Sequence, residues 1–261
     1  MSVTKAAHTA LLARLPEADR ADLRSASGPG AGAFLLPPSQ ADHIMCDAHI
    51  QVAMRMRLRA PAHPAEPSIC QHKHADTRQP CLKLLDGRGF HARTCKVGGG
   101  VVRRHDRIRD WLAAWMLEVS GRSVLTEQYV PRWDRRDEEG RLVRARLDVC
   151  FSDAQGRQVY VDVAVADSAT TCPQDLRARA RKNGVAAASL EDRKRLRYPG
   201  PDLRPFVVEA MGRLGASANA LLKAYVPADA EDRTSFLGAA RQSLSVLVQT
   251  GNAELILSAT G

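Results

Sequence analysis

The sequence predicts an α/β fold whose core contains a mixed sheet in the element order α-β-β-β-α-β. Three observations lead to this prediction. Apolar residues recur with helical spacing over 101–119, alternate with polar residues over 144–151 and 159–165, and form another strand-like run at 205–211 after a long helical stretch. Because successive side chains of a strand point to opposite faces, the alternation marks strands with one apolar face.

Helical segments are expected before this core, over residues 1–62. An amphipathic helix is predicted to run to about residue 26, where a turn-rich linker, Ser27–Gly32, begins. Ser39 and Asp42 then form a capping-box-like start to a second helix, which Pro61 stops. We therefore expect a helical N-terminal extension.

Residues 63–100 differ in character, because apolar periodicity disappears while proline, cysteine and histidine concentrate. Such a segment is either a loop with unligated side chains or a unit organised by a metal. Zinc takes four thiolate or imidazole ligands, and a site whose four ligands all come from the protein is structural. Several sets of four are open here; the favoured one is Cys70, Cys81, His91 and Cys95, with His74 as a substitute.

The expected core, 101–215, carries two aspartates on neighbouring strand candidates. Thirteen residues separate Asp148 from Asp162, including a short polar link with Gly156 of the kind that joins antiparallel strands. Both carboxylates are then expected on one side of the sheet, and Glu127, on the preceding strand candidate 124–130, is a candidate third metal ligand. On spacing alone, ordinary acids of an exposed sheet face are the simpler explanation.

The remaining elements complete the predicted fold. The helical stretch over 173–198 is interrupted at Asn183-Gly184, and 205–211 is the closing strand. Helices over 216–225 and 231–258 are expected to pack at the end of the chain, as a C-terminal part covering 216–261.

The charge of the chain favours a polyanionic partner. The formal net charge is +9, and most of the excess is arginine, whose planar fork suits phosphate. No stretch reaches the roughly 18 apolar residues that span a bilayer, and the N-terminus lacks a secretory pattern. We expect an intracellular protein without a membrane partner, nuclear if it acts on chromosomal DNA, whose cysteines are free or metal-bound.

Several short motifs together resemble one known module. In chain order they are His91-Ala-Arg-Thr-Cys95, Arg103-Arg-His-Asp106, Arg146-Leu-Asp148, Asp162, Lys194, Tyr198 and Pro205-Phe-Val-Val-Glu209. This combination resembles the restriction-like endonuclease region that follows the reverse transcriptase in site-specific non-LTR retrotransposon polyproteins. That region is a branch of the PD-(D/E)XK nuclease superfamily.

Three positions depart from the family pattern. Leu147 stands where the family has proline, and Cys70 and Cys81 are further apart than the family's close cysteine pair. Ala164 occupies the position where classical members of the superfamily carry lysine. In the retrotransposon branch that lysine lies on the following helix, where Lys194 matches it.

The resemblance implies a restriction-endonuclease-like core and a metal-dependent DNA endonuclease that nicks its target. Asp148, Asp162 and Glu127 would hold Mg²⁺ or Mn²⁺, and Lys194 and Tyr198 would join the two aspartates as catalytic residues. Lys194 is otherwise one charge of a solvated face, and His105 is expected to be a packed structural histidine. The arginines expected to contact nucleic acid are Arg103, Arg104, Arg146, Arg177, Arg181 and Arg193.

The implied partners are DNA, RNA and a reverse transcriptase of the same element, and the second metal is structural zinc. The alternative is a catalytically inactive, zinc-stabilised nucleic-acid-binding module, or a fragment of a decayed retroelement polyprotein.

Overall fold

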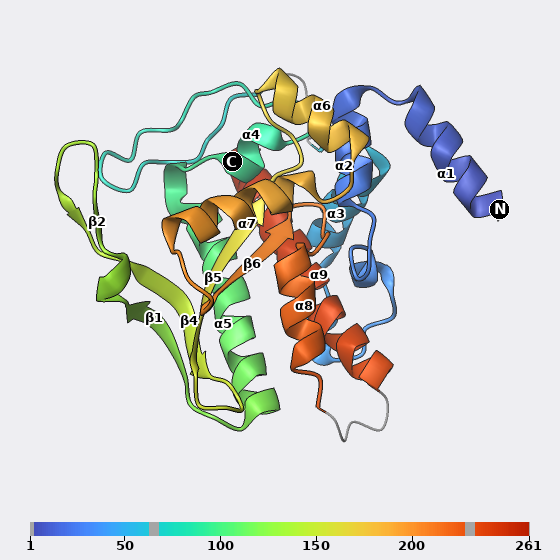
Figure 1. The fold of residues 1–261 in the computed structure, drawn as a ribbon. Helices are drawn as coiled ribbons and strands as arrows, with labels where there is room; N and C mark the ends of the chain where they lie inside the picture. The colour runs from blue at the N-terminus through green and yellow to red at the C-terminus, as the bar shows by residue number, and fades with distance from the viewer. Residues whose placement is uncertain (1–2, 63–67, 228–232, 261) are drawn as a thin grey trace.

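A four-stranded mixed sheet forms the centre of the protein, seen in a computed structural model that describes residues 3–62, 68–227 and 233–260 (Figure 1). The strands lie in the order β1-β4-β5-β6; their bounds are β1 Val124–Tyr129, β4 Arg146–Ser152, β5 Gln158–Ala166 and β6 Leu203–Glu209. The first three pair antiparallel, and β6 runs parallel to β5 because helices connect the two. The predicted α/β class and mixed sheet are confirmed.

Helices cover both faces of this sheet. They are α5 Gly100–Ser120, α6 Pro173–Arg181, α7 Val185–Arg197, α8 Ala216–Ala224 and α9 Arg233–Thr260. On one face, Val161 and Phe206 pack in a core with Leu112 of α5 and with residues of α8 and α9. On the other, Ala187 of α7 packs against Val207. The alternation along β5 therefore separates the two sides, as the sequence predicted.

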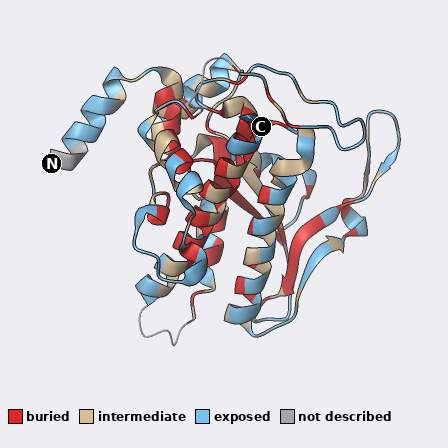
Figure 2. Cartoon of the chain, turned by 180° about the vertical axis from the view of Figure 1, so that it is seen from behind, coloured by how far each residue is buried: buried red, intermediate tan, exposed pale blue. Residues whose placement is uncertain are grey.

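The N-terminal helices are α1 Val3–Arg14, α2 Glu17–Ser25 and α3 Asp47–Leu58. While α1 stands away from the body, α2 packs on α6 and α3 packs on α9 (Figures 1 and 2). A second core joins Val52 and Met56 of α3 to Ile256 of α9, so both terminal parts are built into the fold. Buried residues accordingly line much of α9 (Figure 2).

The predicted end of the first helix near residue 26 is confirmed, since α2 ends at Ser25, but a break inside that helix was not predicted and the predicted start of the second helix was wrong. The first helix is interrupted around Pro16, where α1 has ended and α2 has not begun. The second begins at Asp47, because the Ser39 hydroxyl bonds to Gln242 and His43 instead of capping a helix. The break predicted near Asn183 is confirmed, since α6 ends at Arg181 and α7 begins at Val185.

Some short elements were not predicted. They are β2 Arg135–Arg136, β3 Leu142–Val143 and α4 Phe90–Thr94. The apolar face predicted for β4 is buried but divided: Val149 and Phe151 join the main core, whereas Leu147 joins a smaller cluster around Trp133. Among the described residues, no helix combines the length and the apolar character needed to cross a membrane.

Candidate metal centres

The two aspartates face each other where β4 and β5 separate. The ladder pairs Val149 with Val161, and one further step in that register sets Asp148 opposite Asp162. Instead of a backbone carbonyl, the carboxylate of Asp148 accepts the Val163 N–H, at 2.6 Å from Oδ2. Both acids are largely buried, with side-chain exposures of 12% and 13%. The register thus brings two carboxylates together inside the protein.

Lys194 reaches this pair from α7. Its Nζ lies 2.7 Å from Oδ2 of Asp162 and donates to the carbonyl of Val163 at 3.2 Å. The side chain is 13% exposed, so the ammonium is not part of a solvated face. Asp148, Asp162 and Lys194, which sequence reasoning named separately, therefore form one cluster.

His105 also belongs to this cluster, which sequence reasoning missed. Its Nε2 lies 3.2 Å from Oδ2 of Asp148, and its Nδ1 lies 3.2 Å from Oδ1 of Asp106. The expectation of a packed structural histidine was wrong, because both ring nitrogens face carboxylates. The available signal was its position one turn into the helix that precedes the strands.

The surroundings move the pKa values of these groups apart. Burial raises the pKa of Asp162 to about 6, although the neighbouring Lys194 opposes the change. Burial also acts to raise the pKa of Asp148, but the hydrogen bond and charge of His105 outweigh it and lower that pKa. The bond to Asp148 raises the pKa of His105 to about 9. A buried acid pair with separated pKa values is typical of functional sites.

Glu127 does not join the two aspartates. It adopts a positive φ of 54° and leaves a gap in the β1–β4 ladder between Thr126 and Gln128. Its carboxylate, 46% exposed, pairs with Arg109 at 2.6 Å. The predicted third metal ligand is therefore engaged elsewhere.

Two more predicted site residues are buried in contacts that do not fit the roles expected of them. Tyr198 ends α7 with its ring in the small apolar cluster, 5.5 Å from the ring of Trp133 and only 6% exposed. Arg104 is 7% exposed and donates to the side chain of Asn252, and its burial lowers its pKa to about 10. Arg104 is thus removed from the nucleic-acid-binding set. Other predicted arginines are exposed: Arg103, Arg146, Arg177, Arg181 and Arg193.

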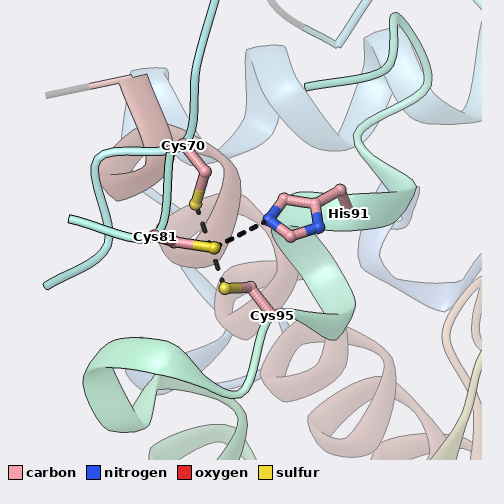
Figure 3. A group of neighbouring side chains, drawn as sticks. All are labelled: Cys70, Cys81, His91 and Cys95. Atoms are coloured by element: carbon pink, nitrogen blue, oxygen red, sulfur yellow. Dashed lines mark hydrogen bonds between the residues drawn. The ribbon is translucent and has the colours of Figure 1, made fainter. Parts of the chain in front are cut away.

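A separate cluster before the sheet has the composition of a zinc site. One ligand-type atom from each of Cys70, Cys81, His91 and Cys95 lies within 4.8 Å of all the others (Figure 3). The sulfurs of Cys70 and Cys95 are 3.9 Å apart, and Cys81 Sγ lies 3.5 Å from His91 Nε2. A tetrahedron with zinc–sulfur bonds of about 2.3 Å has edges of about 3.8 Å. The cluster therefore has the dimensions and ligand types that suit zinc.

The backbone brings these four residues together in two steps. The segment around Cys70 and Cys81 folds back on itself through the bridges Ile69↔Leu84 and Lys73↔Pro80. The Asp86 carboxylate accepts the N–H groups of Phe90 and His91 and so starts α4. His74 is exposed at the far turn of the fold-back segment, outside the cluster.

The three neighbouring cysteines would carry their thiolate charges most easily with a metal cation bound between them. Burial raises the pKa of the Cys95 thiol to about 12, with a further contribution from the neighbouring cysteines. Three thiolates confined together repel one another unless a cation compensates their charge, and zinc binding displaces the thiol protons. The described residues thus support a Cys3His metal site in which the protein supplies four ligands, as structural zinc sites have.

Arg93 links this site to the strand that carries Asp162. It lies on α4 between His91 and Cys95, with its side chain 2% exposed. Its Nε and Nη2 donate to the two carboxylate oxygens of Asp167, each at 3.0 Å, directly after the end of β5. A buried ion pair therefore connects the candidate zinc site to the strand of the acid pair.

Neither the family models nor the curated proteins that were compared with this sequence match it. Its function is therefore inferred from the residues described above and from the family that their motifs resemble.

Proposed function

We propose that this chain is a metal-dependent endonuclease that hydrolyses phosphodiester bonds in DNA. The observation that supports this best is the cluster of Asp148, Asp162 and Lys194. Two carboxylates and a lysine are a combination that phosphodiester hydrolysis can use, with acids to hold a metal and a cation to offset negative charge. The resemblance to the restriction-like endonuclease region of non-LTR retrotransposons names the same three residues.

The acid pair fits Mg²⁺ or Mn²⁺. In both aspartates Oδ2 is engaged by hydrogen bonds, and among the described residues no nitrogen donor reaches either Oδ1. The two carboxylates also interact directly with each other, and a pair of neighbouring carboxylates is a suitable ligand set for a hard cation that keeps several waters. When bound, such a metal polarises the phosphate, activates water and stabilises the leaving oxygen.

The chain's own residues would supply orientation and charge. Lys194 is anchored by the Val163 carbonyl and the Asp162 carboxylate, so its ammonium is held beside the place where a phosphate would approach. The exposed arginines, such as Arg146 two residues before Asp148, would bind the backbone without reading sequence. We assign no catalytic role to Tyr198, because its ring packs in the small apolar cluster.

The wider biological role follows from the resemblance. It suggests an enzyme of retrotransposon origin that nicks chromosomal DNA in the nucleus and works beside a reverse transcriptase of the same element, with RNA as a further partner. The net charge of +9 is consistent with either nucleic acid.

Plasmid nicking is the direct test. Zinc-loaded protein should relax supercoiled plasmid in Mg²⁺ or Mn²⁺ but not in EDTA added just before the assay, and Asp148→Asn or Asp162→Asn should abolish nicking. Asp192→Asn is the matched control: it removes an acid that is 73% exposed, on the same helix as Lys194, and should leave nicking unchanged. Circular dichroism should show that all variants are folded. Full activity in either Asp148→Asn or Asp162→Asn would refute the proposal.

One observation favours a second candidate, a zinc-stabilised nucleic-acid-binding module without catalysis. Lys194 already neutralises Asp162 at 2.7 Å, so the cluster is electrostatically satisfied in part without a cation. Such a module would bind DNA with a steep salt dependence that survives both aspartate substitutions, and it would cleave in no metal.

A further inference from the structure

The Oδ2 atom of Asp148 is held from two sides. The Val163 N–H approaches it at 2.6 Å from β5, and His105 Nε2 approaches it at 3.2 Å from α5. Among the described residues no nitrogen donor is seen at Oδ1 of the same carboxylate, and the carboxylate interacts directly with that of Asp162. Fixing one oxygen of a carboxylate sets the direction of the other, so the direction in which Oδ1 points depends on the Val163 N–H and on His105 Nε2.

His105 is itself held in place by a chain of ion pairs. Its Nδ1 faces Asp106, and Asp106 accepts Nη1 of Arg109 at 3.0 Å. Arg109 in turn pairs with Glu127 on β1, which the ladder register sets opposite Asp148. This series of ion pairs thus runs from α5 to β1, the strand beside β4. The imidazole lies between two carboxylates, and both of its nitrogens are engaged.

We infer that His105 is a positioning residue, which orients the Asp148 carboxylate so that its other oxygen is presented to a divalent cation together with Asp162. This inference rests on the proposed function, because it assigns a role within the same metal site. It explains why a polar, half-buried histidine lies on a helix that otherwise packs against the sheet. It also gives Glu127 a role: the acid supports Arg109 and, through Asp106, the imidazole, without touching the metal.

Hydrogen-bonding partners of metal ligands typically contribute about 10- to 100-fold to metal affinity. His105→Ala should therefore weaken Mn²⁺ binding at this site by roughly that factor. The amide nitrogen of glutamine can take the place of Nε2, and that of asparagine the place of Nδ1. His105→Gln should consequently restore most of the affinity, whereas His105→Asn keeps a donor toward Asp106 but does not reach Asp148 and should resemble alanine.

The measurement is Mn²⁺ titration of the zinc-loaded protein by calorimetry and electron paramagnetic resonance. The Asp148→Asn, Asp162→Asn double variant supplies the baseline for other sites. Nicking rates across Mn²⁺ concentrations add a second readout. If His105 is a positioning residue, His105→Ala should raise the Mn²⁺ concentration that gives the half-maximal rate more than it lowers the rate at saturating Mn²⁺. Thermal melts of each variant should separate both effects from loss of fold.

The outcomes distinguish this inference from the proposed function. Mn²⁺ binding that needs Asp148 and weakens in His105→Ala, without any nicking, would support the inference and refute the nuclease. Wild-type Mn²⁺ affinity in His105→Ala, or equal affinity in His105→Gln and His105→Asn, would overturn the inference alone. Absence of any Mn²⁺ binding above the double-variant baseline would overturn both.

Discussion

Removing one partner of the buried pair between Arg93 and Asp167 should strongly lower the stability of the protein. Arg93→Met keeps most of the side-chain volume but removes three donated hydrogen bonds, two to Asp167 and one, at 3.0 Å, to the carbonyl of Arg88. The carboxylate left behind is only 10% exposed, so water cannot replace the guanidinium. Breaking a buried pair in this way costs about 3–5 kcal/mol, a large part of the 5–15 kcal/mol that stabilises a typical domain.

Urea denaturation of the zinc-loaded protein, followed by tryptophan fluorescence and circular dichroism, measures this loss. Arg122→Met is the control: this arginine is exposed after α5, and its replacement should change stability by no more than about 0.5 kcal/mol. Replacing both partners, with Arg93→Met and Asp167→Met, should recover part of the loss, because Asp167 is no longer left as a buried charge without its partner, while the buried Asp22 still loses the charge of Arg93. A loss below about 1 kcal/mol in Arg93→Met, or no recovery in the double variant, would refute the reasoning.

Three further predictions concern other sites. Cys95→Ala should lower the zinc content measured by atomic absorption and the melting temperature together; unchanged zinc content would exclude Cys95 as a ligand. Burial raises the pKa of Glu209 above its ordinary 4.5, so the stability it contributes is present below that value and is lost as pH rises through the folded-state pKa. Glu209→Gln should therefore gain stability over wild type at pH 8 but not at pH 4 in urea titrations, and an equal gain at both would contradict this. Gly212→Ala should lose about 1–3 kcal/mol by the same titrations, since φ is 104° and the new Cβ would lie 2.7 Å from the Ala31 carbonyl; wild-type stability would disprove the strain.

Local patterns predicted the elements of the core well. The alternation in β5 and the helical stripe of α5 are properties of short segments, and burial of their apolar faces needs no knowledge of the partners. The break near Asn183 was predictable for the same reason, because glycine and asparagine disfavour the helix wherever the chain runs. Helix starts were less predictable, since Ser39 found a partner 203 residues away in Gln242.

The four residues Cys70, Cys81, His91 and Cys95 were predictable as ligand types, and the structure supports that set over the alternative with His74. The choice between His74 and the others was decided by the fold-back of the segment, which turns His74 outward. The bridges that make this fold-back, Ile69↔Leu84 and Lys73↔Pro80, are not readable from residue spacing.

The sequence by itself determined the α/β class and the two candidate aspartates, because strand period, helix period and chemical type are readable along the chain, whereas Lys194 was named only through the resemblance of its motif to a known family. Only the tertiary structure decided that Lys194 lies 2.7 Å from Asp162, that His105 joins Asp148, and that Glu127 and Arg104 are engaged elsewhere. These contacts join residues 18 to 148 positions apart. They depend on how β4, β5, α5, α7 and α9 pack, and packing is set by the sum of many weak interactions that no local pattern records.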